Sequence, residues 1–483
     1  MRSKSSSSSN SVRSASSIKR EESLTPWLFF SVVSITLGSS FQLGYHIGCI
    51  NAPSKEISSF NIDLIWSAIV SVFAVGGMIG GLLSGRLADR FGRKRALLLL
   101  NPVVFVAIGA MVAAKYVHFY PLLIVGRFII GIDAGVVAGV VPIYIMELSP
   151  TSRRGALGSV NQLMITIAIL ISQVIGMPQL LGNNESWHVI FIVSLIPSLF
   201  QLATLPFCPE SPKFNILKHH KDDSAEKDLQ KLRGDDDVLD EIEAILKEAD
   251  LSAFGAKTVG VMNMFKGFNR WPTVVVVVLM AAQQLSGINA AVFYSTRIFE
   301  SALKEKAVYA TLGMGTVMVL QTVVSLYLVD GFGRRPLLLI GFAGMMLSSF
   351  GLFGSVFASG HDVDWAVYLT IAFVFTFVIA FSTGPGPIPF FYATEIFGSN
   401  ERPSAVAIVA FTNWFFAFVV GIGFLPLNNL IGEFVFFFFA YVCTMASILL
   451  FTYLPETKNR NLDEIDYDME CRKPCFVEKK PIY

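Results

Sequence analysis

The hydrophobic residues of this chain are gathered into twelve segments, and each segment is long enough to cross a lipid bilayer. A membrane-spanning helix needs roughly 20 mainly apolar residues. Hydrophobic residues make up 53% of the 483 residues and charged residues only 15%, which is too apolar for an ordinary soluble protein. We therefore predict an all-α membrane protein. The predicted spans are residues 26–50, 64–85, 96–115, 120–146, 157–181, 187–207, 272–298, 308–329, 336–358, 365–394, 404–427 and 434–454.

The segments divide into two groups of six, because the one long polar interval of the chain lies between the sixth and the seventh. Within this interval Leu239, Ile242 and Leu246 recur at spacings of three and four residues, which predicts an amphipathic helix. The predicted parts of the chain are a disordered Ser-rich tail at 1–24, a six-helix bundle at 25–208, an intracellular helical linker at 209–268, a second six-helix bundle at 269–455 and a tail at 456–483.

Three charged motifs of the first half return in the second half at nearly constant offsets of 241, 248 and 246 residues. A duplication this regular indicates two pseudo-equivalent halves, and in membranes the interface between such repeats is the usual place for a transported substrate. The motif pairs are DRFGRKR (Asp89–Arg95) with DGFGRR (Asp330–Arg335), ELSPTSRRG (Glu147–Gly155) with EIFGSNERPSA (Glu395–Ala405), and PESPK (Pro209–Lys213) with PETKN (Pro455–Asn459).

Lys and Arg concentrate in alternate loops, so the positive-inside rule predicts that these loops, the linker and both termini are cytoplasmic. The Ser-rich start of the chain lacks the apolar core of a signal peptide. In this topology the one glycosylation sequon, at Asn184, lies outside. The five cysteines show no disulfide or metal-ligand spacing. We expect no cofactor and no nucleic-acid partner, and no obligate protein partner is evident.

Several short motifs, taken together and in this order, resemble those of the sugar porters of the major facilitator superfamily, and most closely the facilitative glucose transporters of animals. The resemblance extends from about Trp27 to Ile465. It implies a fold of two pseudo-symmetric six-helix bundles, and a plasma-membrane protein that carries a hexose by alternating access. The motifs are GRFIIG (Gly126–Gly131), PESPK, QQLSGIN (Gln283–Asn289), GPGPIP (Gly384–Pro389), PETK (Pro455–Lys458) and both FGR loops.

An uncharged sugar is held by amides, hydroxyls and aromatic or aliphatic faces, and this chain places several amides inside its apolar segments. Gly287 could break the seventh segment and let amides on both sides of it approach one ligand. The alternative is that the amides join helices to one another. The resemblance implies sugar contacts from Gln162, Ile165, Ile169, Gln283, Gln284, Ile288, Asn289, Phe381, Gly386, Asn413 and Trp414.

The resemblance also implies a gate. Tyr294 resembles an extracellular gate residue, and Pro385 and Pro387 give segment ten a joint. At the cytoplasmic ends we expect ion pairs that latch the halves together in the outward-facing state. The alternative is that these arginines only anchor helix ends. The expected latch comprises Glu147 with Arg154, Glu395 with Arg402, and the accompanying Arg93 and Arg334.

The chain departs from glucose-preferring relatives at several positions, which leaves a fructose-selective carrier as an alternative to D-glucose. Met318 stands where these relatives usually carry Asn, Ser382 where they carry an acid, Phe390 where they carry Trp, and Ala417 where they carry a second Asn. A QLS triplet associated with glucose preference is replaced by Met280–Ala282.

A proton-coupled symporter is a second alternative, and a non-transporting sugar sensor is a third. His46 occupies the position at which symporters carry Asp. Asp133 lies about 9 Å along its helix from Arg127 and on another face, so we expect Asp133 to be structural. No nucleophile–base pair or phosphate-binding loop indicates an enzyme.

Overall fold

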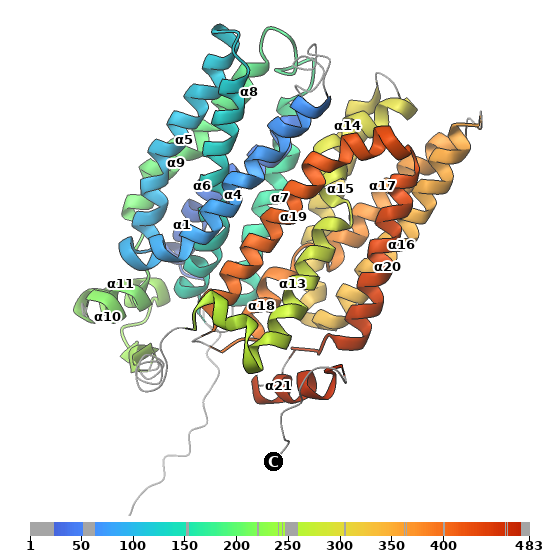
Figure 1. Ribbon diagram of the computed structural model, residues 1–483. Coiled ribbons are helices and arrows are strands. Elements are labelled where there is room, and N and C mark those ends of the chain that lie inside the picture. Colours follow the sequence, from blue (N-terminus) through green and yellow to red (C-terminus); the bar gives the residue numbers. More distant parts are fainter. Residues whose placement is uncertain are drawn as a thin grey trace, which may run out of the picture.

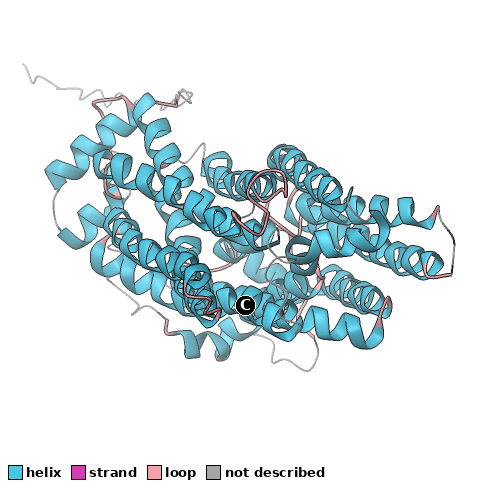
Figure 2. Ribbon diagram, turned by 90° about the horizontal axis from the view of Figure 1, so that it is seen from above, coloured by secondary structure: helices cyan, strands magenta, loops and turns pink. Residues whose placement is uncertain are grey.

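The computed structural model describes residues 24–474, apart from 52–62, 151–153, 220–221, 240, 244, 247–258, 304–305, 362, 364, 399–400, 459 and 461. Helices make up nearly all of the described chain, as Figure 2 shows from above. Twelve of them are long and apolar enough to cross a membrane, which confirms the number predicted from the sequence. The predicted tail at 1–24 lies almost entirely outside the described residues.

The first six spans form the N-terminal half (Figure 1). The first span is composite, because a π-helical turn separates α1 from α2 and a 3-10 turn ends it. The elements are α1 (Pro26–Ile35), η1 (Thr36–Ser40), α2 (Phe41–Gly48), η2 (Cys49–Asn51), α4 (Asp63–Phe91), α5 (Arg93–Tyr116), α6 (Pro121–Leu148), α7 (Arg154–Ile175), α8 (Trp187–Val193), α9 (Leu195–Thr204) and η4 (Leu205–Phe207).

The other six spans form the C-terminal half, and two of them are broken where the sequence predicts it. Gly287 separates α13 from α14 with a φ of 96°, a backbone conformation that favours glycine. The Pro-containing stretch between Thr383 and Ile388 separates α17 from α18. The helices are α13 (Arg270–Leu285), α14 (Ile288–Leu303), α15 (Ala307–Phe332), α16 (Arg334–Ser359), α17 (Ala366–Thr383), α18 (Ile388–Glu395), α19 (Arg402–Ile431) and α20 (Phe434–Tyr453).

Two helix pairs form most of the contact between the halves: α4 packs along α19, and α7 packs along α15. Small residues allow the close approach. A Cβ atom added at Gly77 would lie 2.5 Å from the Trp414 ring, and one added at Gly315 would lie 2.4 Å from Gln173 Oε1. In a membrane, where lipid is as apolar as a side chain, such close packing contributes much of the helix association.

Short helices cover one end of the bundle, which we call the linker side; the opposite end, with the loop that carries Asn184, is the Asn184 side (Figure 1). Thr25 donates a hydrogen bond to the Leu232 carbonyl (2.8 Å), which ties α11 to the N-terminal half. Ser404 of α19 donates to the Val259 carbonyl (2.5 Å), so the far end of the linker contacts the C-terminal half. The short elements are α10 (Pro212–His219), α11 (Asp222–Arg233), η5 (Val261–Phe265), η6 (Gly267–Asn269) and α21 (Leu462–Cys471).

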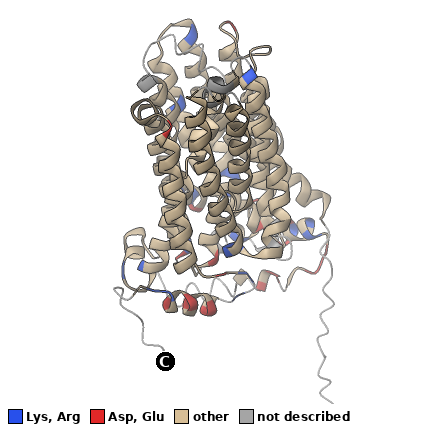
Figure 3. Ribbon diagram, turned by 90° about the vertical axis from the view of Figure 1, so that its right-hand side faces the viewer, with Lys and Arg blue, Asp and Glu red and all other residues tan. Residues whose placement is uncertain are grey.

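Charged residues gather at the linker side and are sparse along the spans (Figure 3). The predicted helix around Ile242 is seen in the described residues there, which are helical at 239, 241–243 and 245–246. Its apolar side chains are only partly buried: Ile242 is half-buried, whereas Leu239 is 62% exposed and Leu246 is 42% exposed.

Candidate functional site

At the linker side the two halves carry the same hydrogen-bonding motif. Glu210 accepts hydrogen bonds from the backbone N–H groups of the first two residues of α5 (2.9 and 3.1 Å). Glu456 does the same for the first two residues of α16 (2.9 and 3.0 Å). The residues before these helices, Gly92 and Gly333, have φ values of 88° and 93°. A carboxylate at a helix N-terminus satisfies unpaired N–H groups and interacts favourably with the helix dipole.

The pKa of Glu456 reflects this capping. Burial raises the pKa, but hydrogen bonds from the backbone N–H groups of Lys458, Arg334, Arg335 and Thr457 outweigh burial and hold the pKa below its ordinary 4.5. Glu456 is therefore a carboxylate held in its charged form by the backbone.

The arginine of each FGR loop pairs with the last acid of a neighbouring span. Arg93 Nε lies 2.9 Å from Glu147 Oε2, and Arg93 Nη2 donates to Oε1 (2.9 Å). Arg334 Nη2 lies 2.8 Å from Glu395 Oε1. Thr457 also donates to Glu395 (2.5 Å). Bidentate pairs of this kind fix the geometry of both partners.

These ion pairs differ from the expected latch. The guanidinium of Arg402 donates to the Phe397 carbonyl (3.4 Å) and not to Glu395, whose carboxylate lies beside Arg334. The side chain of Arg154 lies outside the described residues. Both described pairs, Arg93 with Glu147 and Arg334 with Glu395, join helices of one half. In this conformation they hold each half together and do not connect the halves.

The predicted amides of segments seven and eleven converge on one network. Gln283 donates to the carbonyls of Pro385 (2.6 Å) and Gly386 (3.0 Å). Its Oε1 accepts from Gln284 (3.2 Å) and from Asn413 (3.0 Å). Gln284 Oε1 in turn accepts from Asn289 (2.5 Å), across the break at Gly287. The broken helices α13 and α14 thus present three amides together with the Pro-containing joint of segment ten.

Two predicted contact residues of the C-terminal half complete this region. Phe381 is buried, and its carbonyl accepts from the Gly386 N–H (2.8 Å). Ile288 is buried at the start of α14. Phe381 is linked to the network through Gly386, whose carbonyl accepts from Gln283, and Ile288 directly precedes Asn289. Apolar faces therefore lie beside the amides, as a sugar site with hydroxyl and C–H contacts requires.

Trp414 lies at the junction of the halves. Its ring packs on Gly77 of α4 and meets Phe73 edge to face, at a centroid distance of 5.6 Å. Its buried indole N–H has no hydrogen-bond partner in the described part of the chain. The side chain therefore offers one donor and one aromatic face to a ligand between the halves.

The contacts expected from the N-terminal half lie on α7. Gln162 and Ile165 are half-buried, and Ile169 is buried. Glycines of α2 allow the approach of α7, because a Cβ atom at Gly44 would lie 2.2 Å from the Ile165 carbonyl oxygen. In the described part of the chain no hydrogen bond joins these three residues to the amide network, and the two groups lie in different halves.

The Asn184 side contains contacts that the sequence did not reveal. Asn51 at the end of the first span donates to Ser295 of α14 (2.7 Å), and both residues are buried. The predicted gate residue Tyr294 donates to the Gly421 carbonyl (2.9 Å) and stacks on Phe424. The Asn51–Ser295 bond joins the two halves on this side. The sequence signal that could have pointed to these contacts is the presence of polar residues within or beside apolar segments, because such residues need hydrogen-bond partners.

Asn184 is exposed in the loop between α7 and α8, so burial of its side chain would not hinder attachment of a glycan.

No acid pairs with Arg127 among the described residues. The Arg127 guanidinium is fully buried, donates to the His46 carbonyl (2.9 Å) and lies 4.5 Å from the Phe73 ring centroid. Asp133 is buried farther along α6. The Arg127 guanidinium therefore interacts with a backbone carbonyl and an aromatic ring, and with no acid of the described residues.

The residues that replace polar groups of glucose-preferring relatives are mostly buried. Met318, Ser382 and Ala417 are each at most 5% exposed, whereas Phe390 is half-buried. The Ser382 hydroxyl has no partner among the described residues.

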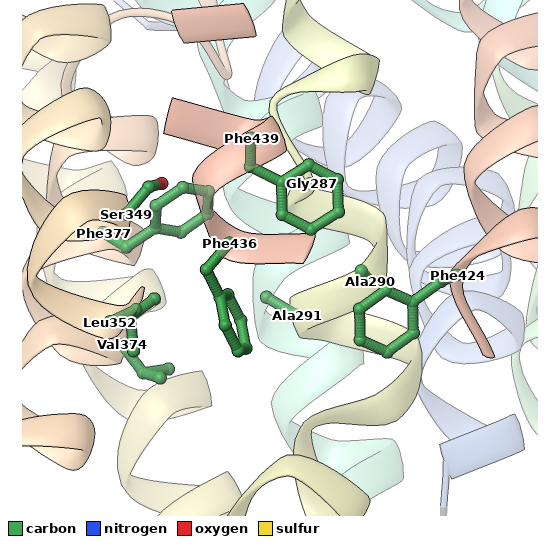
Figure 4. A pocket seen from close by; sticks show the side chains of 10 residues that line it. All are labelled: Gly287, Ala290, Ala291, Ser349, Leu352, Val374, Phe377, Phe424, Phe436 and Phe439. Carbon is green, nitrogen blue, oxygen red and sulfur yellow. The ribbon is translucent and has the colours of Figure 1, made fainter. Parts of the chain in front are cut away.

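One apolar pocket lies beside the break in segment seven (Figure 4). Its wall contains one polar side chain, that of Ser349, so the pocket does not suit a sugar. A Cβ atom at Gly287 would lie 2.6 Å from the ring of Phe439. The lining residues are Gly287, Ala290, Ala291, Ser349, Leu352, Val374, Phe377, Phe424, Phe436 and Phe439.

A family model described as sugar (and other) transporter matches residues 31–469. Facilitated glucose transporter protein 1 of Caenorhabditis elegans is 45% identical over 471 residues, which covers 93% of this chain and 92% of that protein. Solute carrier family 2, facilitated glucose transporter member 1 of Gallus gallus is 40% identical over 461 residues, with 92% and 94% covered.

Solved structures show the same fold. The xylose transporter XylE from E. coli, in a partially occluded inward open conformation, has a TM-score of 0.75 at 24% identity and covers 90% of this chain and 100% of that chain. The proton:xylose symporter XylE bound to 6-bromo-6-deoxy-D-glucose has a TM-score of 0.77 at 24% identity, with 91% and 98% covered. The fold is therefore the major facilitator fold, and the chain belongs to the sugar transporter family.

Proposed function

We propose that this chain is a facilitative uniporter that carries a hexose, D-glucose in the first place, across the plasma membrane. The observation that carries the proposal is the amide network around Gln283. An uncharged ligand with several hydroxyls needs amides that both donate and accept, and these amides are already close together. The names of the relatives from Caenorhabditis elegans and Gallus gallus, both facilitated glucose transporters, support glucose as the substrate.

The network would open to admit the sugar. In this conformation the amides hydrogen-bond to one another, and a bound hexose would replace some of these bonds with bonds to its hydroxyls. The amides are those of Gln283, Gln284, Asn289 and Asn413. The exchange of one hydrogen bond for another keeps the cost of binding low. Phe381, Ile288 and Trp414 would contact the C–H faces, and Gln162, Ile165 and Ile169 would complete the site when α7 approaches.

Transport would proceed by alternating access, with the linker side in the cytoplasm and the Asn184 side outside. The Asn51–Ser295 bond closes the Asn184 side in this conformation. When that side opens, we expect the linker side to close, with Arg154 and Arg402 reaching acids of the opposite half. Arg93 and Arg334 would hold Glu147 and Glu395 in position for that contact. The joint at Pro385 and Pro387 would absorb the movement of segment ten.

A uniporter needs no coupled ion. The buried Arg127 bonds to a backbone carbonyl and to no described acid, which argues against a group that binds and releases a proton in each cycle. The small or apolar Met318, Ser382 and Ala417 support fructose as a second candidate substrate, because they leave fewer side chains to bond the hydroxyls of glucose.

The proposal is tested with purified protein in vesicles. Labelled D-glucose should equilibrate across the membrane, and an imposed pH gradient should not drive accumulation above the outside concentration. Unlabelled D-glucose should compete more strongly than D-fructose. Accumulation under the pH gradient would contradict uniport, stronger competition by fructose would reassign the substrate, and absence of any hexose flux would contradict the proposal as a whole.

A further inference from the structure

Gln173 is a buried amide whose hydrogen-bonding groups are both unused. It lies two residues before the end of α7, on the Asn184 side, and is 4% exposed. Neither Nε2 nor Oε1 has a partner in the described part of the chain. Buried amides are normally hydrogen-bonded, and a buried unpaired amide is destabilising. The structure around Gln173 therefore suggests that the amide finds partners in another conformation.

The position of Gln173 along α7 links it to the proposed sugar contacts. On an α-helix each residue advances by 100°. Ile169 and Gln173 follow Gln162 by seven and eleven residues, so all three point within roughly 20° of one direction. Gln173 lies roughly 16 Å beyond Gln162 along the helix axis, toward the Asn184 side. It thus extends the same stripe toward that surface.

The surroundings of Gln173 place it between the two halves. Gly315 of the facing helix α15 lies against Gln173, because a Cβ atom added at Gly315 would lie 2.4 Å from Gln173 Oε1 and 3.1 Å from Leu170. The side chain fits because the facing residue is glycine. Separation of α7 from α15 would expose the amide to the space between the halves, at the end of the stripe that leads to Gln162.

We propose that Gln173 is a further sugar-binding residue, which forms an outer subsite for a hexose hydroxyl while the Asn184 side is open. This inference rests on the proposed hexose transport. The ligand is a neutral polyol because the site offers one amide, which can both donate and accept, and because Ile169, which lies on the stripe between Gln173 and Gln162, is apolar. When the halves close, the sugar has moved inward and the amide packs against Gly315.

The test measures sugar affinity separately from each side, in sealed vesicles of known orientation. Gln173→Leu removes the amide and keeps a similar volume. Zero-trans influx of D-glucose through this variant should show an affinity weakened about fivefold, the loss expected for one neutral hydrogen bond. Zero-trans efflux should keep its wild-type affinity, because the inner path does not include Gln173.

Monodeoxy-D-glucoses identify the hydroxyl. In wild-type protein one of these sugars should bind from outside about fivefold less tightly than D-glucose, and Gln173→Leu should abolish that difference. Gln173→Asn, which keeps the amide on a shorter side chain, should restore part of the discrimination. Gln321→Leu serves as the matched control, because Gln321 lies in α15 and donates to Thr383 (2.9 Å); it should cause no loss confined to influx.

Two results would overturn the inference. Unchanged influx affinity in Gln173→Leu would show that the amide binds no sugar. Opposite shifts of similar size in influx and efflux affinity would show that Gln173 only biases the balance between conformations. Both results differ from failure of the proposed function, in which wild-type protein would carry no hexose. If Gln173→Leu does not fold, Gln173→Asn with the deoxysugar series decides between the same outcomes.

Discussion

The linker-side ends of the two halves are nearly identical, whereas the sugar site between the halves is not. At the linker side Tyr144 and Tyr392 donate to the carbonyls of Pro209 and Pro455. Lys94 donates to the Pro206 carbonyl (2.6 Å), and the FGR arginines pair with equivalent acids. The duplicated motifs thus keep equivalent contacts at the linker-side helix ends of both halves.

The amide network shows the opposite pattern. Gln283, Gln284 and Asn289 belong to the seventh span, whose counterpart in the first half is the composite first span. That span offers Leu43, His46 and Ile47 in the corresponding region, and the ring nitrogens of His46 have no partner among the described residues. A symmetric scaffold therefore supports an asymmetric site. The difference suggests that conformational balance and sugar binding depend on separate residues.

The largest expected effect is on sugar binding. Gln283→Ala removes the residue that bonds to Gln284, Asn413 and the carbonyls of Pro385 and Gly386. With two or three hydrogen bonds of about 1 kcal/mol each at stake, glucose affinity should fall roughly 30-fold or more. Isothermal titration of purified protein measures this. Affinity within twofold of wild type would remove Gln283 from the site.

The next effect is on the stability of each half. Arg334→Gln leaves the partly buried Glu395 without its charged partner, and Arg93→Gln does the same to Glu147. Each variant should lose about 1 to 3 kcal/mol of stability, seen as a lower thermal unfolding temperature in detergent. If only one of the two variants were destabilised, the equivalent ion pairs would not contribute equally to the stability of the two halves.

A smaller effect concerns closure of the Asn184 side. Asn51→Ala removes the buried hydrogen bond to Ser295, worth about 1 kcal/mol. The ratio of the closed to the open arrangement should fall about fivefold. Sugar affinity measured from outside should rise and affinity from inside should fall. Ser295→Ala should act the same way, and the double variant should add little. Additive effects would show that the two residues do not act through this bond.

The smallest effect is a dependence of stability on pH. Because the folded-state pKa of Glu456 is below its ordinary 4.5, its contribution to stability is fully present above 4.5 and is lost as the pH falls from there through the lower folded-state pKa. Glu456→Gln should therefore unfold at a lower temperature than wild type near pH 7, and the difference should shrink as the pH falls below 4.5. A difference in unfolding temperature that stayed constant with pH would show that capping by Glu456 does not depend on its charge.

Much of the fold follows from the sequence, because hydrophobic length fixes the spans and glycine and proline fix the breaks. Gly287 and Pro385 end helices as predicted. The π-helical turn at Thr36–Ser40 was not predicted, since no proline or charge marks it. The Asn51–Ser295 bond was missed because its partners are far apart in the chain.

The predicted site residues show where sequence reasoning stops. The convergence of the amides of segment seven could be predicted from the sequence, because Gly287 allows a break in the helix and the family resemblance implies that these amides bind sugar. The partner of Glu395 could not, because Arg334 and Arg402 are both near the membrane boundary and only the helix geometry selects Arg334. The packing of Trp414 on Gly77 likewise depends on how the halves meet, which no local pattern encodes.

The most direct test compares Gln283→Ala with Arg402→Gln by measuring glucose affinity from both sides of the membrane in vesicles of known orientation. The separation of binding from conformational balance predicts that Gln283→Ala weakens affinity from both sides by a similar factor. Arg402→Gln should shift the two affinities in opposite directions. If Gln283→Ala produced the opposite shifts, or Arg402→Gln weakened both sides equally, binding and balance would not reside in separate regions.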